Sequence, residues 1–188
     1  MKKIHLRNTP EDFNGRLETY PHYIIIEHLA SWIKPINYLE IGVRWGDVYN
    51  LVNPFAENCY LVDINFLDIT YTSNSKKFEM TSDDFFKIIN PSLKFDMVFI
   101  DGDHSKEQVY KDFINVKDKV IEDGFVILHD TSPCDERMTL PGYSNNCWEA
   151  MLDIKQHHRD EWEYITLPFN PGLTLMKKMN INKQLAWK

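Results

Sequence analysis

The chain alternates between short continuous apolar runs and longer stretches in which apolar residues recur at helical spacing. The apolar runs lie at 38–43, 59–63, 77–80, 95–101 and 125–130. Runs of four or five apolar residues are typical of strands buried on both faces, as in a parallel sheet. The stretches between them predict helices at about 46–53, 82–89, 105–121 and 144–158. Apolar residues at helical spacing predict a further helix over 23–33, which Pro35 ends.

Strand–helix alternation of this kind predicts a doubly wound, Rossmann-like α/β fold with a mostly parallel sheet. The last part of the chain differs, because the apolar segments 162–167 and 173–176 are separated by turn-forming residues 168–172. We therefore expect an antiparallel strand pair to close the sheet. A chain of 188 residues fits one domain, which we place at 23–188, after a polar N-terminal arm at 1–22.

The first predicted strand leads into a turn that contains Gly42 and Gly46. Glycine lets the backbone turn tightly and lets a ligand lie against the main chain. A dinucleotide fingerprint would need glycines where Arg44 and Asp47 stand, so the nicotinamide interpretation fails. Glu40, two positions before Gly42, resembles instead the acidic residue of the first motif of S-adenosylmethionine methyltransferases. Alone, this motif also fits a strand–helix turn without a ligand. We expect Arg44 to point outward or over the methionine carboxylate of such a cofactor.

Asp63 ends the second predicted strand, about 20 residues after the glycine turn. Acidic residues at this place bond ribose hydroxyls in nucleotide-binding folds, and a carboxylate can accept from both hydroxyls at once. By itself Asp63 also fits an ordinary turn at the end of a strand. Together with the glycine turn, it favours a ribose contact.

Two further apolar strands stop on carboxylates, Asp101 and Asp130. If these strands are neighbours, their ends lie about 4.8 Å apart at the edge where open α/β sheets bind ligands. Two converging carboxylates repel each other unless a cation lies between them, and a divalent ion with oxygen ligands is a simple answer. His104 and His129 belong to the same cluster. The pair at 157–158 is expected on the solvated face of a helix instead.

The order E-x-G-x-x-x-G, strand-end Asp, F-I-D-G-D-H-S and G-F-V-I-L-H-D-T resembles the small-molecule O-methyltransferase family that includes macrolide-sugar and aminocoumarin-type enzymes. The resemblance covers roughly residues 23–178. It implies that the cofactor, S-adenosylmethionine, is held by Glu40, Gly42, Gly46, Asp63 and Asp101, with Met80, Thr81 and Ser82 near the adenine. It also implies a Mg²⁺ site formed by Asp101, Asp130 and His129, with His104 as the general base. The chain departs from the family pattern at Lys106, where an aromatic residue is common, and at Cys147, where an aliphatic residue is usual.

These assignments predict metal-assisted O-methylation of a hydroxyl on a small molecule such as a sugar or a phenol. Coordination to a divalent cation lowers the pKa of a hydroxyl, and a histidine can then accept its proton. Residues 131–146 could form the loop that covers the substrate. Three alternatives remain at this stage: a metal-dependent oxygenase with two histidines and an aspartate, a non-catalytic cofactor-binding domain, and a methyltransferase that acts on protein or nucleic acid.

Net charge, cysteine content and the length of the apolar runs limit the classes of binding partner and the cellular compartment. The formal net charge is −7, which disfavours a nucleic-acid backbone as partner. The three cysteines, at 59, 134 and 147, show no metal-finger spacing and suit a reducing compartment. No apolar run approaches the roughly 18 residues that span a bilayer, and the N-terminus lacks the apolar stretch of a signal peptide. We therefore expect a cytoplasmic protein without a nucleic-acid or membrane partner, and leave open whether it forms a homodimer.

Overall fold

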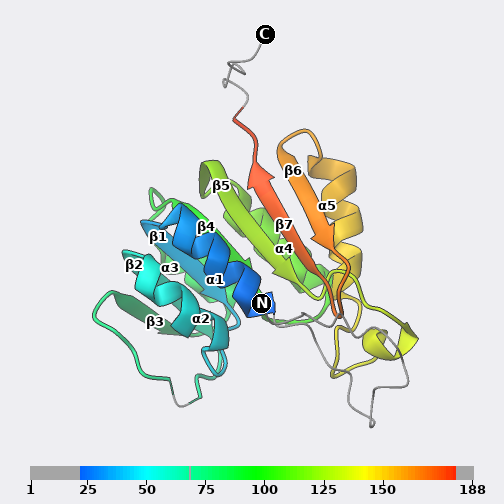
Figure 1. The fold of residues 1–188 in the computed structure, drawn as a ribbon, viewed down its shortest axis with the longest axis horizontal. Helices are drawn as coiled ribbons and strands as arrows, with labels where there is room; N and C mark the ends of the chain where they lie inside the picture. Colours follow the sequence, from blue (N-terminus) through cyan, green and yellow to red (C-terminus); the bar gives the residue numbers. More distant parts are fainter. Residues whose placement is uncertain (1–21, 68, 181–188) are drawn as a thin grey trace, which may run out of the picture.

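The computed structural model describes residues 22–67 and 69–180, which form one seven-stranded sheet with helices on both faces (Figure 1). The strands are β1 (Asn37–Ile41), β2 (Asn58–Asp63), β3 (Ser75–Glu79), β4 (Phe95–Ile100), β5 (Val120–His129), β6 (Trp162–Leu167) and β7 (Leu173–Lys178). Their order across the sheet is β3-β2-β1-β4-β5-β7-β6. Strands β1 to β5 pair in parallel, whereas β7 pairs antiparallel with both β5 and β6. The predicted Rossmann-like sheet with its C-terminal antiparallel pair is confirmed.

The helices cover the two faces of the sheet in two groups. They are α1 (His22–Ile33), α2 (Asp47–Val52), α3 (Ser82–Ile88), α4 (Lys106–Lys117) and α5 (Ala150–His158), with short 3₁₀ turns η2 (Asn53–Phe55), η3 (Glu136–Thr139) and η4 (Cys147–Glu149). Buried residues of α1 and α2 belong to one core cluster, and those of α3, α4 and α5 to the other. Figure 1 shows α1 and α2 in front of the strands. No helix in the described ranges is both long and apolar enough to cross a membrane.

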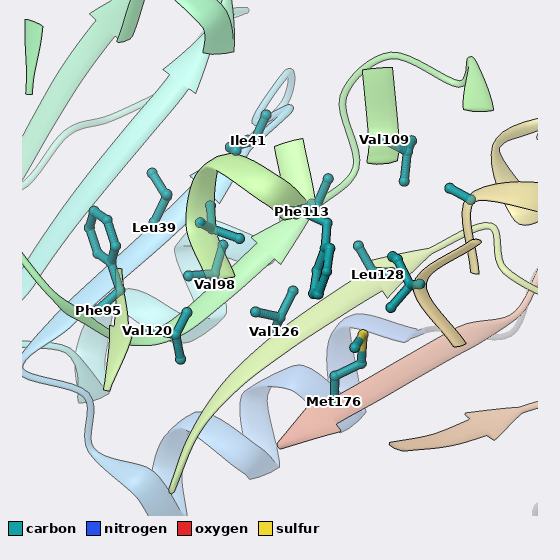
Figure 2. Close-up of a cluster of buried hydrophobic side chains, with 14 of the residues drawn as sticks. Leu39, Ile41, Phe95, Val98, Val109, Phe113, Val120, Val126, Leu128 and Met176 are labelled. Atoms are coloured by element: carbon teal, nitrogen blue, oxygen red, sulfur yellow. The ribbon is translucent and has the colours of Figure 1, made fainter. Parts of the chain in front are cut away.

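Each core cluster takes alternate residues of the central strands, because successive side chains of a strand point to opposite faces. On the α4 side, Val126 and Leu128 of β5 pack with Phe113 of α4 and Met176 of β7 (Figure 2). Ile127, between them in sequence, belongs to the opposite cluster. Burial on both faces explains why the sequence shows continuous apolar runs here rather than alternation.

Several predicted boundaries were wrong. The helix expected over 105–121 ends at Lys117, because Val120 already pairs with Phe95 as the first residue of β5. The helix expected over 144–158 begins only at Ala150, after turns and η4. At the N-terminal end α1 takes in His22, which we had placed in the arm; the rest of that arm lies outside the described residues.

The ends of β1 and β4 are held together at Gly42. The Asp101 amide donates to the Ile41 carbonyl at 2.8 Å, and the Gly42 amide donates to the Val62 carbonyl at 2.9 Å. Gly42 has φ +87°, and a Cβ there would overlap the backbone carbonyl of Asp101. Both the positive φ and the close approach therefore require glycine.

We expect Gly42→Ala to destabilise the protein more than Gly142→Ala does. Gly142 has a similar φ of +92° with nothing near its missing Cβ, so its substitution measures the cost of the backbone conformation alone, about 1–2 kcal/mol. Gly42→Ala adds the overlap with Asp101, worth about 1–3 kcal/mol more. Urea unfolding of both variants measures the difference, and equal free energies of unfolding would contradict the contact.

Candidate active site

A cavity of about 1070 Å³ opens at the carboxyl ends of β1, β2, β4 and β5. Its walls include Glu40 and Gly42 from the end of β1, Asp63 from the end of β2, Asp101 after β4 and His129 at the end of β5. This is the edge at which open α/β sheets bind ligands, and the volume is that of a small-molecule site. The cavity joins the glycine turn to the cluster of histidines and aspartates.

Asp63 holds the glycine turn in place. Its Oδ2 accepts hydrogen bonds from the amides of Val43 at 2.7 Å and Arg44 at 2.8 Å, and its Oδ1 accepts one from the Asn65 amide at 2.9 Å. Charge-assisted bonds of this kind are strong, so the carboxylate fixes the backbone that follows Gly42. A ribose hydroxyl would bond to oxygens that already serve these amides, and the predicted ribose contact stays a prediction.

Of two other residues of the turn, one lines the cavity and the other does not. Arg44 is exposed, has φ +47° and lines the cavity wall. Gly46 (φ +75°) precedes α2, and the nearest atoms to its missing Cβ belong to the Ile69 side chain. Gly46 does not belong to the cavity lining. It shapes the turn from behind rather than touching the space a ligand would fill.

Glu40 is an acid buried in the floor of the cavity. Its side chain is 1% exposed, and the Tyr38 hydroxyl donates to its Oε2 at 2.6 Å. Burial raises the pKa of Glu40 to about 8 against the opposing effect of the Tyr38 hydrogen bond, and the negative charge of Asp101 raises it further. Glu40 therefore carries a proton at neutral pH and can donate as well as accept a hydrogen bond.

The residues expected near an adenine lie together beside α3. Thr81 accepts from the Asp84 amide and begins that helix, and Met80, Thr81 and Ser82 all line the cavity. The Gln108 amide donates to Ser82 Oγ at 3.1 Å and to Asp112 Oδ1 at 3.0 Å. Burial raises the pKa of Asp112 to about 6. Sequence analysis missed Gln108 and Asp112, although their i, i+4 spacing on a predicted helix was a usable signal.

Asp101 and Asp130 converge as expected, because β4 and β5 are parallel neighbours. His129 Nδ1 lies 3.0 Å from Asp101 Oδ1 and 3.6 Å from Asp130 Oδ1. The backbone of Asp130 is left-handed, with φ +59°, and the buried Ser144 hydroxyl donates to its Oδ1 at 2.9 Å. The side chains of Asp101, His129 and Asp130 therefore lie next to one another in the cavity wall, and their role as a ligand set stays a prediction.

The surroundings shift the pKa values of the Asp101 and Asp130 carboxylates in opposite directions. Burial alone would raise the pKa of Asp101, but the charge of His129 and hydrogen bonds from His104 and His129 outweigh it and hold that pKa below its usual range. Burial raises the pKa of Asp130, and the charge of Asp101 adds to the effect. Burial and the neighbouring carboxylates oppose each other at His129, whose pKa is raised on balance. Asp101 is thus the more firmly ionised member of the pair.

His104 bridges the carboxylates from the loop after β4. Its Nε2 lies 3.3 Å from Asp130 Oδ2 and 3.7 Å from Asp101 Oδ1, and its Nδ1–H donates to the Tyr143 carbonyl. The interaction with Asp101, helped by the Tyr143 carbonyl and Asp130, raises the pKa of His104 to about 9 against the effect of burial. On these side chains alone His104 is protonated at neutral pH. It can act as a base only where another cation offsets the carboxylates.

His22 is a member of the cluster that sequence analysis missed. Its ring contacts that of His129, with centroids 3.9 Å apart and the planes tilted by 46°, and stacks on Phe99. Burial lowers the pKa of His22 to about 4, so it is neutral at physiological pH. Nothing in the helical pattern of α1 connects its first residue to the end of β5, and only the packed fold brings them together.

The segment 131–146 forms part of the wall, through Met138, Tyr143 and Ser144. This is the loop expected over the substrate. The expectation for the pair at 157–158 was half wrong: His157 is exposed, but the His158 side chain is only 13% exposed, packs on Phe113 and lies 3.0 Å from Glu161. His158 is the last residue of α5, and its ring packs against Tyr110 and Phe113 of α4.

The central part of the chain matches a known family. Residues 39–131 match the family model described as a methyltransferase domain. This span runs from β1 to the residue after Asp130 and includes the glycine turn, Asp63 and Asp101. A search of curated proteins finds no match to this sequence.

Solved structures with the same fold include three methyltransferases. The SAH-bound methyltransferase PaMTH1 from Podospora anserina is 15% identical, with 87% of this chain and 80% of that chain covered and a TM-score of 0.64. The O-methyltransferase TomG from Streptomyces achromogenes, involved in tomaymycin synthesis and in complex with SAM, is 13% identical, with 90% of this chain and 85% of that chain covered and a TM-score of 0.64. An O-methyltransferase from Bacillus cereus in complex with SAH is 12% identical, with 86% of this chain and 82% of that chain covered and a TM-score of 0.64. At these identities the likeness is one of fold.

The buried Glu40 makes stability depend on pH. Its pKa is about 8 in the folded protein against 4.5 as the reference value, so between these values the folded state holds a proton that the unfolded state has lost. Stability must then fall as pH rises, by about 1.4 kcal/mol per pH unit at most.

We expect Glu40→Gln to flatten this dependence between about pH 5.5 and 7.5, measured by urea unfolding at each pH. Glu79→Gln is the matched control, because Glu79 also lies at the carboxyl-terminal part of a parallel strand but is exposed. Other groups with raised pKa values contribute equally to both proteins and cancel in the comparison. Parallel curves for wild type and Glu40→Gln would show that Glu40 is ionised in the fold.

Proposed function

We propose that the chain, whose residues 39–131 match a methyltransferase domain, is a class I, S-adenosylmethionine-dependent methyltransferase. It would methylate a hydroxyl oxygen of a small molecule with the help of a divalent cation. One observation carries the proposal: a single cavity connects the glycine turn to the cluster of Asp101, His104, His129 and Asp130. A methyltransferase needs its cofactor and its acceptor hydroxyl within reach of each other, because the transfer is an in-line displacement.

The cofactor half of the proposal rests on the turn and the acids around it. Gly42 lines the cavity and lets the turn lie against the backbone of Asp101, Asp63 would accept from the ribose, and Glu40, protonated at neutral pH, would bond the methionine part. The segment Met80–Thr81–Ser82 would border the adenine, and Gly46 would support the turn. Bound S-adenosylmethionine would supply the electrophilic methyl group. These residues fit it, because the cavity passes all of them except Gly46 and has room for a molecule of that size.

The acceptor half rests on the carboxylates and His104. Donor atoms of Asp101, His104 and Asp130 lie within 4.8 Å of one another, and His129 Nδ1 lies 3.0 Å from Asp101 Oδ1 and 3.6 Å from Asp130 Oδ1. A cation beside the two carboxylates would therefore be bound by oxygen ligands. Such an ion, for which Mg²⁺ was the expectation from the sequence, would lower the pKa of a nearby substrate hydroxyl. The Tyr143 carbonyl holds His104 Nδ1–H, so Nε2 is the atom that would take the proton. A cation beside the carboxylates would also lower the pKa of His104 toward the range of a base.

The proposed substrate class rests on the residues that line the cavity and on the net charge of the chain. Met138 and Tyr143 of the loop over 131–146 border the cavity next to His104, which suits a small sugar-like or phenolic acceptor. The net charge of −7 disfavours a nucleic-acid substrate. The oxygenase alternative would use the His/Asp cluster but would leave Asp63 and the glycine turn without a function.

We expect the protein to bind S-adenosylmethionine with micromolar affinity, about −8 kcal/mol, in titration calorimetry. Asp63→Ala should weaken binding by about 1.5–3 kcal/mol, because charge-assisted hydrogen bonds are lost. Glu79→Ala, at the paired position of β3, is the control and should bind as wild type does. Equal affinity for wild type and Asp63→Ala would remove Asp63 from the cofactor site, and binding of NADH in place of S-adenosylmethionine would overturn the proposed function.

His104→Ala should reduce turnover by about 10²–10⁴-fold, the range for a lost general base, while affinity for S-adenosylmethionine stays the same. Turnover is measured as release of S-adenosylhomocysteine with a panel of polyhydroxylated sugars and phenols. His157→Ala replaces an exposed histidine on α5 and should leave turnover unchanged.

Chelation should abolish turnover but not cofactor binding, and Asp130→Asn should behave like chelation and recover partly in excess divalent ion. Full activity in excess chelator would exclude the metal, and oxygen consumption with Fe²⁺ would favour the oxygenase.

A further inference from the structure

A third imidazole, that of His22, reaches the His/Asp cluster from α1. Donor atoms of His22, Asp101 and His129 lie within 4.8 Å of one another, as do those of Asp101, His104 and Asp130. The two groups share Asp101, so they form one continuous cluster at one end of the cavity. His22 also lines that cavity.

Two imidazole nitrogens of this cluster have no hydrogen-bond partner among the described residues. They are Nδ1 of His22 and Nε2 of His129, and both atoms are buried. The His129 side chain as a whole is only 10% exposed. Burying a polar nitrogen without a partner costs free energy, and buried polar atoms in native proteins are nearly always bonded. Two such atoms on neighbouring rings beside a cavity indicate that a ligand completes them.

We propose that His22 is a further ligand of the metal site, and that the two imidazoles of His22 and His129, together with the Asp101 carboxylate, bind a first-row transition metal ion in preference to Mg²⁺. This inference deepens the metal-assisted part of the proposed function and rests on it for the chemistry, but not for the binding. It replaces the expectation of Mg²⁺ with an ion such as Mn²⁺, Fe²⁺, Co²⁺ or Zn²⁺.

The chemistry of the donors decides this preference. Mg²⁺ takes oxygen ligands almost exclusively and keeps several waters. Imidazole nitrogen suits zinc, iron and other transition metals, and affinity for mixed nitrogen and oxygen sites rises along the first row. His129 Nδ1 is hydrogen-bonded to Asp101 Oδ1 at 3.0 Å, which fixes the ring and leaves the buried, unpartnered Nε2 as the imidazole atom that would bind the ion. A ligand from α1 would also tie the first helix to the end of β5.

The test compares metal binding by wild type and His22→Phe after removal of bound metal with a chelator. Phenylalanine keeps a ring over His129 and Phe99 but removes both nitrogens. Titrations with Co²⁺, followed by visible absorption, and with Zn²⁺, Mn²⁺ and Mg²⁺, followed by calorimetry, should show wild type binding Zn²⁺ and Co²⁺ at least about tenfold more tightly than Mg²⁺. His22→Phe should lose about 10–100-fold in affinity for Zn²⁺ and Co²⁺ and little for Mg²⁺.

His28→Phe is the matched control, because His28 lies on the same helix with its side chain exposed, and it should bind as wild type does. X-ray absorption of the Zn²⁺ forms separates a ligand from a packing residue: two coordinated imidazoles in wild type and one in His22→Phe support the proposal. Equal affinities and equal imidazole counts in the two proteins overturn it, as does tighter binding of Mg²⁺ than of the other ions. Metal binding that depends on His22 in a protein without affinity for S-adenosylmethionine would uphold this inference while overturning the proposed function.

Discussion

The contact between the backbones of Gly42 and Asp101 links the two halves of the site. It closes the carboxyl edge of the sheet between β1 and β4, and it leaves no room for a side chain on the glycine. On one side of it the chain enters the turn that Asp63 holds by two amides. On the other side the carboxylate of Asp101 faces His129. Because the contact between Gly42 and Asp101 positions both the glycine turn and the Asp101 carboxylate, it also sets the distance between the turn and the His/Asp cluster.

The second constraint is the amount of negative charge gathered at this edge. Glu40 and Asp130 are buried, and the negative charge of the partly exposed Asp101 raises the pKa of both. The structure relieves the repulsion in three ways. Glu40 keeps a proton and a Tyr38 hydrogen bond, Asp101 is paired with histidines, and Asp130 accepts from Ser144. The acids therefore differ in protonation although they lie in one cavity, which is the condition for giving them different chemical roles.

Much of the fold follows from local pattern. The apolar runs of β1, β2, β4 and β5 are buried on both faces, as expected. The expectation was wrong for β3, which lies at the edge of the sheet and is mostly exposed. The turn-forming residues between β6 and β7 indicate a hairpin. The helix boundaries were predicted wrongly where the local sequence pattern fits more than one structure. Residues 118–121 continue a helical pattern in sequence, yet the pairing of Val120 with Phe95 in the sheet outweighs helical propensity. Near Ala150 the helix starts late because Ser144 and Cys147 are engaged with Asp130.

For the site, the sequence by itself determined which carboxylates end which strands, since an apolar run that stops on Asp101 or Asp130 needs no tertiary information to be recognised. Only the tertiary structure decided what surrounds them. His22 and Tyr143 are far in sequence from the strand ends that they contact, and Asp63 turns its oxygens to backbone amides. The physical reason is that strand periodicity is a local property of the chain. Burial, charge pairing and the approach of α1 to β5 depend instead on contacts between residues that only the packed sheet and helices bring together.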